Sequence, residues 1–399
     1  MNFFISAIYY LSKETNKLLV SLYIILIKRF AKVKDNRIVF QGKPDYSDNP
    51  RALSDYLVAN GYSKKYELFW IVRNKKENNR KHKGVLIHFL RDKNNLGFNS
   101  PATIYYFLTA KYIFCSHGFI IPISKKRSEQ QYVALWHGCG YKDKRSDMPI
   151  RFFDKALVPG PLFVKTKSYF WNTSAEHLLP IGYPRYDWLL HPSENAIKMM
   201  RRIRKSGNKV VLWMPTVREM KAKLNNDETI STHFPLLKND EDWGILDAFC
   251  KDNGIIILVK LHQSEKGFGI LYSKLNNIRQ ISNEDFEKNG VPMYEFISLT
   301  DALITDYSSI AIDYLLVNKP IAFTLDDYDL YKQVRGFVFD NPKDYMPGHH
   351  LYNYEDLLGF IRDVISNNDL YIDARKKVSF QAIYKSENYC KELVSCLGL

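Results

Sequence analysis

Cysteine is scarce in this sequence, and its N-terminal apolar run is short. The five cysteines are Cys115, Cys139, Cys250, Cys390 and Cys396. Their odd number and the lack of a CxxC spacing argue against a disulfide framework and a structural zinc site, and favour a reducing compartment. The apolar stretch between residues 17 and 28 is shorter than the ~20 residues that cross a bilayer, and it lacks the flanks of a signal peptide.

Several motifs of nucleotide-binding proteins and hydrolases are also missing. The sequence has no P-loop GxxxxGK[ST], no GxGxxG that opens a helix, and no GxSxG elbow. No DxD-like carboxylate pair directly follows a predicted strand, and Asp326-Asp327, in a loop after Phe323, is a weak metal candidate. We therefore expect neither a metal ion nor a cofactor. No basic recognition helix or RNP-like strand occurs, so nucleic acid is not an expected partner.

Basic residues, by contrast, are in excess. Lys and Arg number 57 against 43 Asp and Glu, which gives a net charge of +14 over 399 residues. A hydrophobic content of 46% is that of an ordinary globular protein, and the length predicts two domains. The charge suits an anionic partner such as a phosphorylated metabolite or an acidic membrane.

Residues 1–36 differ in composition from the rest of the chain. Up to residue 34 they combine aromatic and aliphatic residues with six basic ones against one acid, Glu14. This pattern predicts an amphipathic helix that lies in the membrane interface, held by apolar burial and by attraction to anionic lipid. The alternative is an amphipathic helix that packs on the protein body.

From Arg37 onward, short apolar runs alternate with segments of helical length. Strands are predicted at 37–41, 68–72, 85–89, 112–115, 131–136, 155–158, 210–214, 255–260, 278–281, 302–305 and 321–323. Such alternation predicts an α/β fold with parallel sheets covered by helices on both faces. We expect two Rossmann-like domains, at 37–195 and 205–372, followed by a helical tail at 373–399.

Polar residues follow several of these strands. Ligands of open α/β sheets bind beyond the carboxyl ends of the strands. The residues in such positions are His117, His137, Thr216, Arg218, His262, Asp306, Ser308 and Ser309, and Lys260 is the last residue of the strand predicted at 255–260. A single histidine there is more often structural, but recurrence in both halves favours a shared site.

Each of these residue types suits work on a phosphate. His137 lies among glycines, which allow a close ligand approach, and it can act as a general base on a hydroxyl. Arg218 can clamp a phosphate with two hydrogen bonds, and His262 can donate to one. Ser308 and Ser309 lie at a strand-to-helix junction, where they cap the helix or form a phosphate seat.

Seven segments carry a resemblance to a known family. They are RIVFQGKPDYSDNPRAL (37–53), LWHGCGYKDK (135–144), IGYPRYDWL (181–189), VVLWMPTVRE (210–219), LVKLHQ (258–263), LITDYSSIAIDYLLVNKPIAF (303–323) and RGFVFDNPKDYMPG (335–348). In content and order the chain resembles the CDP-glycerol glycerophosphotransferases of teichoic acid and capsule synthesis, which are GT-B-type enzymes.

The resemblance implies two domains that face a cleft. The C-terminal domain would hold CDP-glycerol or CDP-ribitol, and the N-terminal domain a lipid-linked saccharide or a growing polyol-phosphate chain. His137 and His262 would be catalytic. The donor would be bound by Arg218, Thr216, Lys260, Asp306, Ser308 and Ser309, and the acceptor side would include His117, Lys142 and Arg185.

The resemblance also implies a reaction and a location. An acceptor hydroxyl would attack the β-phosphorus of CDP-glycerol, His137 would take its proton, and CMP would leave. The enzyme would lie at the cytoplasmic face of the bacterial cell membrane, attached through residues 1–34. Departures from the family pattern at Cys139, Tyr186 and Gln263 leave the acceptor and the alditol open.

Two other functions fit parts of the sequence. One is a GT-B glycosyltransferase that uses a nucleotide sugar. The other is a non-catalytic binder of anionic polymer at the membrane surface, which accounts for the charge but not for histidines at strand ends in both halves. The sequence does not distinguish a primase from a polymerase.

Overall fold

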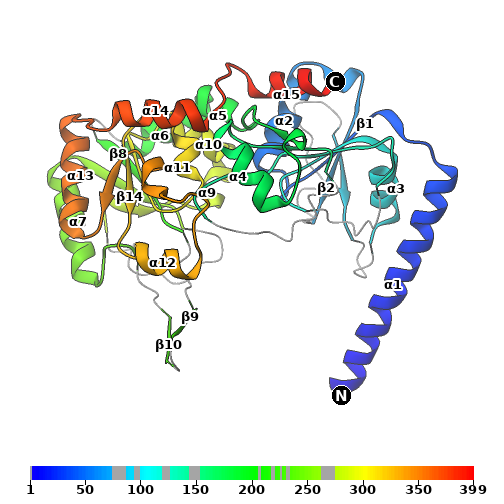
Figure 1. The fold of residues 1–399 in the computed structure, drawn as a ribbon, viewed down its shortest axis with the longest axis horizontal. Coiled ribbons are helices and arrows are strands. Elements are labelled where there is room, and N and C mark those ends of the chain that lie inside the picture. Colours follow the sequence, from blue (N-terminus) through cyan, green and yellow to red (C-terminus); the bar gives the residue numbers. More distant parts are fainter. Residues whose placement is uncertain are drawn as a thin grey trace.

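A computed structural model of the chain describes most of its residues. The described ranges are 2–73, 87–93, 99–118, 126–142, 153–204, 208–216, 221–224, 227–230, 234–261 and 275–399. Two parallel sheets dominate the structure (Figure 1). The predicted α/β class with parallel sheets is confirmed.

The N-terminal half is built on a seven-stranded sheet. Its strands are β1 (Lys34–Gln41), β2 (Glu67–Val72), β3 (His88–Arg91), β4 (Ala110–Cys115), β5 (Gln131–Ala134), β6 (Lys155–Leu157) and β7 (Leu178–Leu179). The order is β3-β2-β1-β4-β5-β6-β7, and every pair is parallel. The strand order reverses between β1 and β4, which is where ligands bind in such sheets.

The C-terminal half repeats this design with six strands. They are β8 (Lys209–Met214), β11 (Ile255–Val259), β12 (Ile278–Gln280), β13 (Ala302–Thr305), β14 (Ile321–Thr324) and β15 (His349–Leu351), in the order β12-β11-β8-β13-β14-β15. All pairs are again parallel, and the order reverses between β8 and β13. A separate antiparallel hairpin joins β9 (Lys221–Leu224) to β10 (Asp227–Ile230).

Helices cover the faces of both sheets. They are α1 (Asn2–Phe30), α2 (Asp48–Ala59), α3 (Pro101–Thr109), α4 (Leu162–Trp171), α5 (Tyr186–Leu190), α6 (Glu194–Arg204), α7 (Asp240–Asp252), α9 (Asn283–Asn289), α10 (Met293–Ser298), α11 (Ile310–Tyr314), α12 (Tyr328–Val334), α13 (Tyr354–Ser366), α14 (Ile372–Ala382) and α15 (Tyr389–Leu397). Short 3₁₀ turns occur at Tyr62–Lys64, Ala175–His177 and Pro342–Tyr345. Capping boxes headed by Asn239, Ser282 and Asn353 fix the starts of α7, α9 and α13.

The strands carry the buried core. In β11 all five residues are buried, which is expected of a parallel strand with helices on both of its faces. One apolar cluster runs without interruption from the N-terminal sheet to one face of the C-terminal sheet, and a second cluster fills the other face. The two halves therefore share part of their core.

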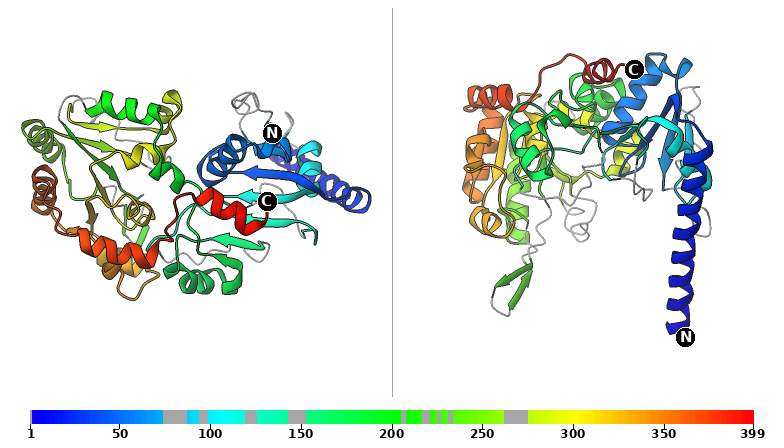
Figure 2. Two further views of the ribbon diagram at one scale, coloured as in Figure 1. Left: turned by 90° about the horizontal axis from the view of Figure 1, so that it is seen from above. Right: turned by 45° about the vertical axis from the view of Figure 1, so that its right-hand side comes forward.

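The helix α1 projects from the N-terminal half (Figures 1 and 2). Its inward stripe of Val20, Tyr23, Ile24 and Ile27 packs on the body, where α1 contacts α3. An outward stripe stays exposed and consists of Leu18, Leu19, Leu22, Ile25, Leu26 and Phe30. Within the described residues, no helix is both long and apolar enough to span a bilayer.

The C-terminal helices return to the N-terminal half (Figure 2). Helix α14 contacts α4, and α15 contacts α2 and α5. The carboxylate of Asp187 accepts hydrogen bonds from the backbone N–H groups of Tyr389 and Cys390 at 2.6 and 3.0 Å. The start of α15 is thereby fixed to α5 of the N-terminal half.

Candidate functional site

The loop after β5 presents His137 to solvent. Asn49, at the start of α2, holds this loop because its Nδ2 donates to the carbonyl oxygens of Leu135 and Trp136 at 3.1 and 3.0 Å. Trp136 adopts a left-handed backbone conformation with a φ of 57°. A bulky residue takes that conformation only where its surroundings enforce it.

The hydrogen bonding of His137 defines its tautomer. Its Nδ1 lies 3.0 Å from the backbone carbonyl oxygen of Ser116, at the end of β4. A carbonyl oxygen only accepts, so Nδ1 carries the proton, and Nε2 of the neutral ring carries the lone pair. The ring is thus oriented as a general base.

His117 lies beside His137, as the sequence predicts for two strand ends at one edge. Their rings stack with centroids 4.2 Å apart. Burial, reinforced by the neighbouring His137, lowers the pKa of His117 from 6.5 to about 4. His117 is therefore neutral near pH 7 and adds no positive charge beside the base.

The His137 loop touches the C-terminal half at Ser309. A Cβ on Gly138 would lie 2.4 Å from Ser309 Oγ, and a Cβ on Gly140 would lie 2.9 Å from the backbone nitrogen of Ser309. Both positions therefore need glycine. The structure thus brings together a predicted catalytic residue of one half and a predicted donor residue of the other.

The residues that follow this loop, Tyr141 and Lys142, also contact the C-terminal half. The backbone carbonyl of Tyr141 accepts a hydrogen bond from Val338 N–H at 2.8 Å, and its hydroxyl donates to the carbonyl of Tyr345 at 2.8 Å. Lys142 forms an isolated antiparallel bridge with Phe337. These bonds place Lys142 at the junction of the halves, and its contact with an acceptor stays a prediction.

Asp306 and Thr216 meet where the second sheet reverses its strand order. The backbone N–H and the Oγ1 of Thr216 both donate to Asp306 Oδ2, at 2.7 and 2.8 Å. Asp306 is fully buried, and its Oδ1 has no partner in the described structure. The carboxylate therefore holds the loop after β8 and keeps one acceptor oxygen unused.

Lys260 and the two serines follow β11 and β13, the two strands that flank β8. Lys260 follows β11, is 8% exposed, and has its pKa lowered by burial. Ser308 and Ser309 are half-buried and precede α11. The Ser309 side chain makes no cap hydrogen bond in this short helix, so the capping role that the sequence suggests for it is absent.

Arg185 lies in the interior, 2% exposed. Its Nη1 donates to Asp48 Oδ1 at 2.6 Å and to the carbonyl of His137 at 3.0 Å. Its Nη2 donates to Asp313 Oδ2 at 2.7 Å. Arg185 thus joins the base-bearing loop to α11, while a contact with the acceptor stays a prediction.

The carboxylate of Asp313 is fully buried and closes this network. It also accepts hydrogen bonds from the hydroxyls of Tyr186 and Tyr294, each at 2.6 Å. Burial raises the pKa of Asp313, whereas Arg185 and the two hydroxyls oppose the rise. Burial also disfavours the charge of Arg185, but Asp313 and Asp48 outweigh it, so the pKa of Arg185 lies above its ordinary value.

The sequence does not identify Asn49 or Tyr294 as site residues. Asn49 lies within the 37–53 segment that carries the resemblance, which was an available signal, but Tyr294 had none. Two predicted site residues, Arg218 and His262, lie outside the described residues. Among the residues that the structure does describe, no group of three or more His, Cys, Asp or Glu is arranged to hold a metal ion.

A family model decides the assignment. The model described as CDP-glycerol:poly(glycerophosphate) glycerophosphotransferase matches residues 22–388. The chain belongs to this family. It is therefore a transferase that acts with CDP-glycerol in teichoic acid synthesis, and the resemblance read from the seven segments is confirmed.

Individual relatives agree with the assignment to this glycerophosphotransferase family. A teichoic acid poly(glycerol phosphate) polymerase of Bacillus spizizenii is 27% identical over 362 residues, which cover 82% of this chain and 84% of that protein. A teichoic acid glycerol-phosphate transferase of Staphylococcus aureus is 26% identical over 403 residues, which cover 91% and 93%. The solved structure of the wall teichoic acid polymerase TagF shares the fold, with a TM-score of 0.76, 21% identity and coverage of 99% and 96%.

Proposed function

We propose that the chain transfers glycerol phosphate from CDP-glycerol to a hydroxyl of a lipid-linked saccharide or of a growing teichoic acid chain, with release of CMP. The observation that carries these roles is the contact between the loop of His137 and Ser309. It joins a base on one sheet to phosphate-binding candidates on the other. The family match supports the donor.

In this mechanism His137 Nε2 accepts the proton of the acceptor hydroxyl. The hydroxyl oxygen then bonds to the β-phosphorus of CDP-glycerol while the bond between that phosphorus and the bridging oxygen breaks, and CMP leaves in line. Ser308, Ser309 and Lys260 stabilise the charge on the phosphates, together with Arg218 and His262. Positioning and fixed donors supply most of the rate gain in phosphoryl transfer.

The proposed arrangement is that of a GT-B enzyme. The C-terminal half holds the donor beyond β8 and β13, where Asp306 fixes Thr216. Because a carboxylate repels a diphosphate, Asp306 acts by positioning this loop and by offering Oδ1 to a donor hydroxyl. The N-terminal half holds the acceptor next to His137.

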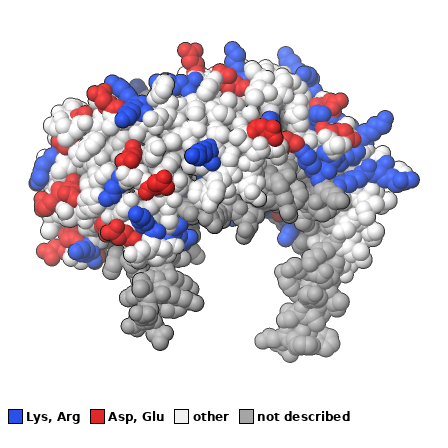
Figure 3. All heavy atoms as spheres, viewed as in Figure 1, with Lys and Arg blue, Asp and Glu red and all other residues white. Residues whose placement is uncertain are grey.

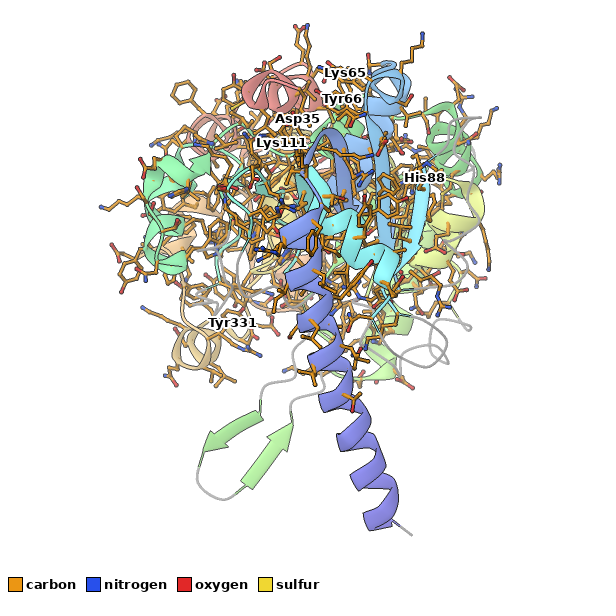
Figure 4. The ribbon with its side chains drawn as sticks, turned by 90° about the vertical axis from the view of Figure 1, so that its right-hand side faces the viewer. Asp35, Lys65, Tyr66, His88, Lys111 and Tyr331 are labelled. Carbon is orange, nitrogen blue, oxygen red and sulfur yellow. The ribbon has the colours of Figure 1, made fainter. Side chains whose placement is uncertain are left out.

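We further propose that α1 attaches the enzyme to the cytoplasmic face of the membrane. Basic residues gather where α1 meets the body (Figure 3). The last turn of α1 carries Lys28 and Arg29, and Lys32 and Lys34 follow it in the sequence. Figure 4 labels Asp35, Lys65, Tyr66 and Lys111 close to the same end of the helix. A basic surface beside an apolar stripe suits an anionic lipid interface.

The position of α1 supports this role. Asn16 exchanges hydrogen bonds with Asn99 at 3.1 and 3.4 Å, and Asn99 pairs with Lys93 just beyond the carboxyl end of β3. Asn16 thus marks the level of the edge where the site lies. The preceding residues of α1 extend about 20 Å further on that side, at 1.5 Å per residue. Membrane binding through this N-terminal part of α1 would keep the site near a lipid-linked acceptor, whereas the basic residues at the other end of α1 lie at the opposite edge of the sheet.

The donor assignment is tested by parallel incubation with CDP-glycerol, CDP-ribitol and a UDP-sugar. A lipid-linked acceptor is present, and nucleotide release is followed. We expect CMP from CDP-glycerol and no UDP from the sugar nucleotide. Release of UDP alone would instead support the GT-B glycosyltransferase, and no turnover with any donor would support a non-catalytic binder.

The base assignment is tested by His137→Gln. We expect turnover to fall by about 10²–10⁴-fold because the proton acceptor is lost, with binding of CDP-glycerol retained. His88→Gln, at an exposed histidine of β3, is the control and should keep full activity. Wild-type turnover by His137→Gln would refute the base assignment without touching the donor assignment.

A further inference from the structure

Helix α4 carries a lysine in the middle of its inward face. The buried residues of this helix are Phe163, Lys167 and Trp171, spaced four residues apart on one side. Lys167 is 7% exposed, whereas Lys165 on the other side of the helix is exposed. An ammonium thus interrupts an otherwise aromatic stripe.

This ammonium lacks a carboxylate partner in the described structure. Its recorded contact is with the ring of Trp171, whose centroid lies 5.3 Å from Nζ. The 7% of Lys167 that stays exposed is the part of the residue that a ligand can reach. A largely buried charge is costly unless a counter-charge accompanies it, and here none comes from the described part of the chain.

Lys167 lies directly behind the loop that bears the proposed base. Trp171 packs on Trp136 with centroids 4.7 Å apart, and Trp136 packs on His137 at 4.3 Å. Burial raises the pKa of the Cys139 thiol, and the charge of Lys167 opposes that rise. Ring contacts therefore connect the Lys167 ammonium to His137, and the electric field of this ammonium acts on Cys139.

We propose that Lys167 binds a phosphate group of the acceptor, as a subsite on the N-terminal side of the reaction centre. This inference rests on the proposed function. In a poly(glycerol phosphate) acceptor one glycerol unit separates the reacting hydroxyl from the nearest phosphate. An acceptor that places its hydroxyl at His137 thus brings an anion into the same neighbourhood, where its phosphate supplies the counter-charge that Lys167 lacks in the described structure.

The location favours the acceptor over the donor as the source of the phosphate. Helix α4 follows β6 of the first sheet, whereas the donor candidates Thr216, Asp306 and Ser309 belong to the second half. Lys167 and His137 both belong to the N-terminal half, which meets Ser309 of the C-terminal half at the His137 loop. A donor phosphate would instead lie against the C-terminal half.

The test compares Lys167→Met, Lys167→Arg and the surface control Lys165→Met in the full chain. CMP release is measured with saturating CDP-glycerol and with increasing amounts of a lipid-linked acceptor that ends in glycerol phosphate. We expect Lys167→Met to raise the acceptor KM about tenfold or more, which corresponds to about 1.4 kcal/mol. The KM for CDP-glycerol should stay unchanged, and Lys167→Arg and Lys165→Met should resemble the wild type.

Two results overturn the subsite. One is an unchanged acceptor KM in Lys167→Met. The other is a raised KM for CDP-glycerol in place of the acceptor, which would assign the lysine to the donor. Should Lys167→Met fail to fold, Lys167→Gln takes its place, because glutamine removes the charge and keeps a polar side chain, and an unchanged acceptor KM in that variant overturns the subsite. Absence of CMP release by the wild type would instead refute the proposed function itself.

Discussion

At the scale of single residues, the neutral state of His117 has a consequence for stability. Its folded pKa of about 4 lies below the ordinary 6.5, so between these values the unfolded chain binds a proton that the folded chain does not. Stability therefore rises with pH across this window and falls on acidification. Burial also lowers the pKa of His349 and His350, which act in the same direction.

We predict that His117→Asn weakens this dependence. The free energy of unfolding should fall less between pH 7 and pH 5 in the variant than in the wild type, because one low-pKa group is gone. Urea denaturation at pH 5, 6 and 7 measures both slopes. Equal slopes would show that His117 titrates alike in the folded and unfolded chains.

Residues at strand ends could be predicted from the sequence, and buried polar partners could not. His117, His137 and Ser309 follow apolar runs, and parallel strands bring their carboxyl ends to one edge. Arg185 and Asn49 follow no apolar run, and only the family resemblance pointed to Arg185 and to the segment that holds Asn49; arginine and asparagine usually lie on the surface. Their burial depends on partners from distant parts of the chain.

At the scale of elements, the contact between the His137 loop and Ser309 can be tested through Gly140. A Cβ there would lie 2.9 Å from the backbone N and Cα of Ser309, and neither atom can move as a flexible side chain can. We predict that Gly140→Ala destabilises the fold by about 1–3 kcal/mol through overpacking and lowers kcat/KM for both substrates.

The control for this variant is Gly244→Ala in α7, where a Cβ would meet nothing within 4 Å. Removing a glycine from a helix should leave the protein equally stable or more stable by about 0.5–1 kcal/mol. Thermal unfolding and CMP release distinguish the two variants. Gly140→Ala with wild-type stability and activity would mean that the loops are not in tight contact.

Helix α1 offers a second prediction at this scale. Replacing exposed Leu19, Leu22 and Leu26 by Ser should reduce binding to vesicles that contain phosphatidylglycerol, because apolar burial holds interfacial helices. CMP release from CDP-glycerol with a soluble acceptor should be preserved. The control is Ile245→Ser, at an apolar residue of α7 that is 52% exposed. Undiminished flotation of the triple variant with vesicles would contradict membrane attachment through α1.

Most strands could be predicted because they are continuous apolar runs, as at 255–260. Strand β15 could not, since two of its three residues are histidines and a Pro-Gly pair directly precedes them. Its place depends on pairing with β14. The sequence-based strand at 85–89 and the observed β3 overlap, but residues 85 and 86 lie outside the described residues.

At the scale of the whole molecule, the network around Asp313 fastens one half to the other. Arg185 and Tyr186 come from the first half, and Asp313 and Tyr294 from the second. We predict that Asp313→Asn destabilises the protein by about 3–5 kcal/mol, because it leaves the Arg185 charge buried with one carboxylate fewer. Urea denaturation measures the loss.

The control is Asp373→Asn, which removes an exposed ion pair with Lys376. Such pairs contribute about 0–1 kcal/mol, so its stability should match the wild type. A similarly small effect of Asp313→Asn would mean that the halves are held by their shared apolar core alone.

The two-sheet architecture followed from the repeated strand pattern, but the connection between the sheets did not. Apolar periodicity shows which face of an element is buried without showing which partner buries it. The buried ion pair and the Tyr141 contacts join segments more than a hundred residues apart. Only the assembled structure shows that they meet.

The return of the C-terminal helices limits how the halves can move. The chain passes from the first sheet to the second after α6 and passes back between α14 and α15, where Asp187 ties down the last helix. The backbone therefore crosses the boundary between the two halves at two places. If the halves open to admit CDP-glycerol or release CMP, these two crossings restrict the motion to rotation about the axis that joins them. Cutting the chain after α14 would remove one crossing and allow the halves to rotate about other axes.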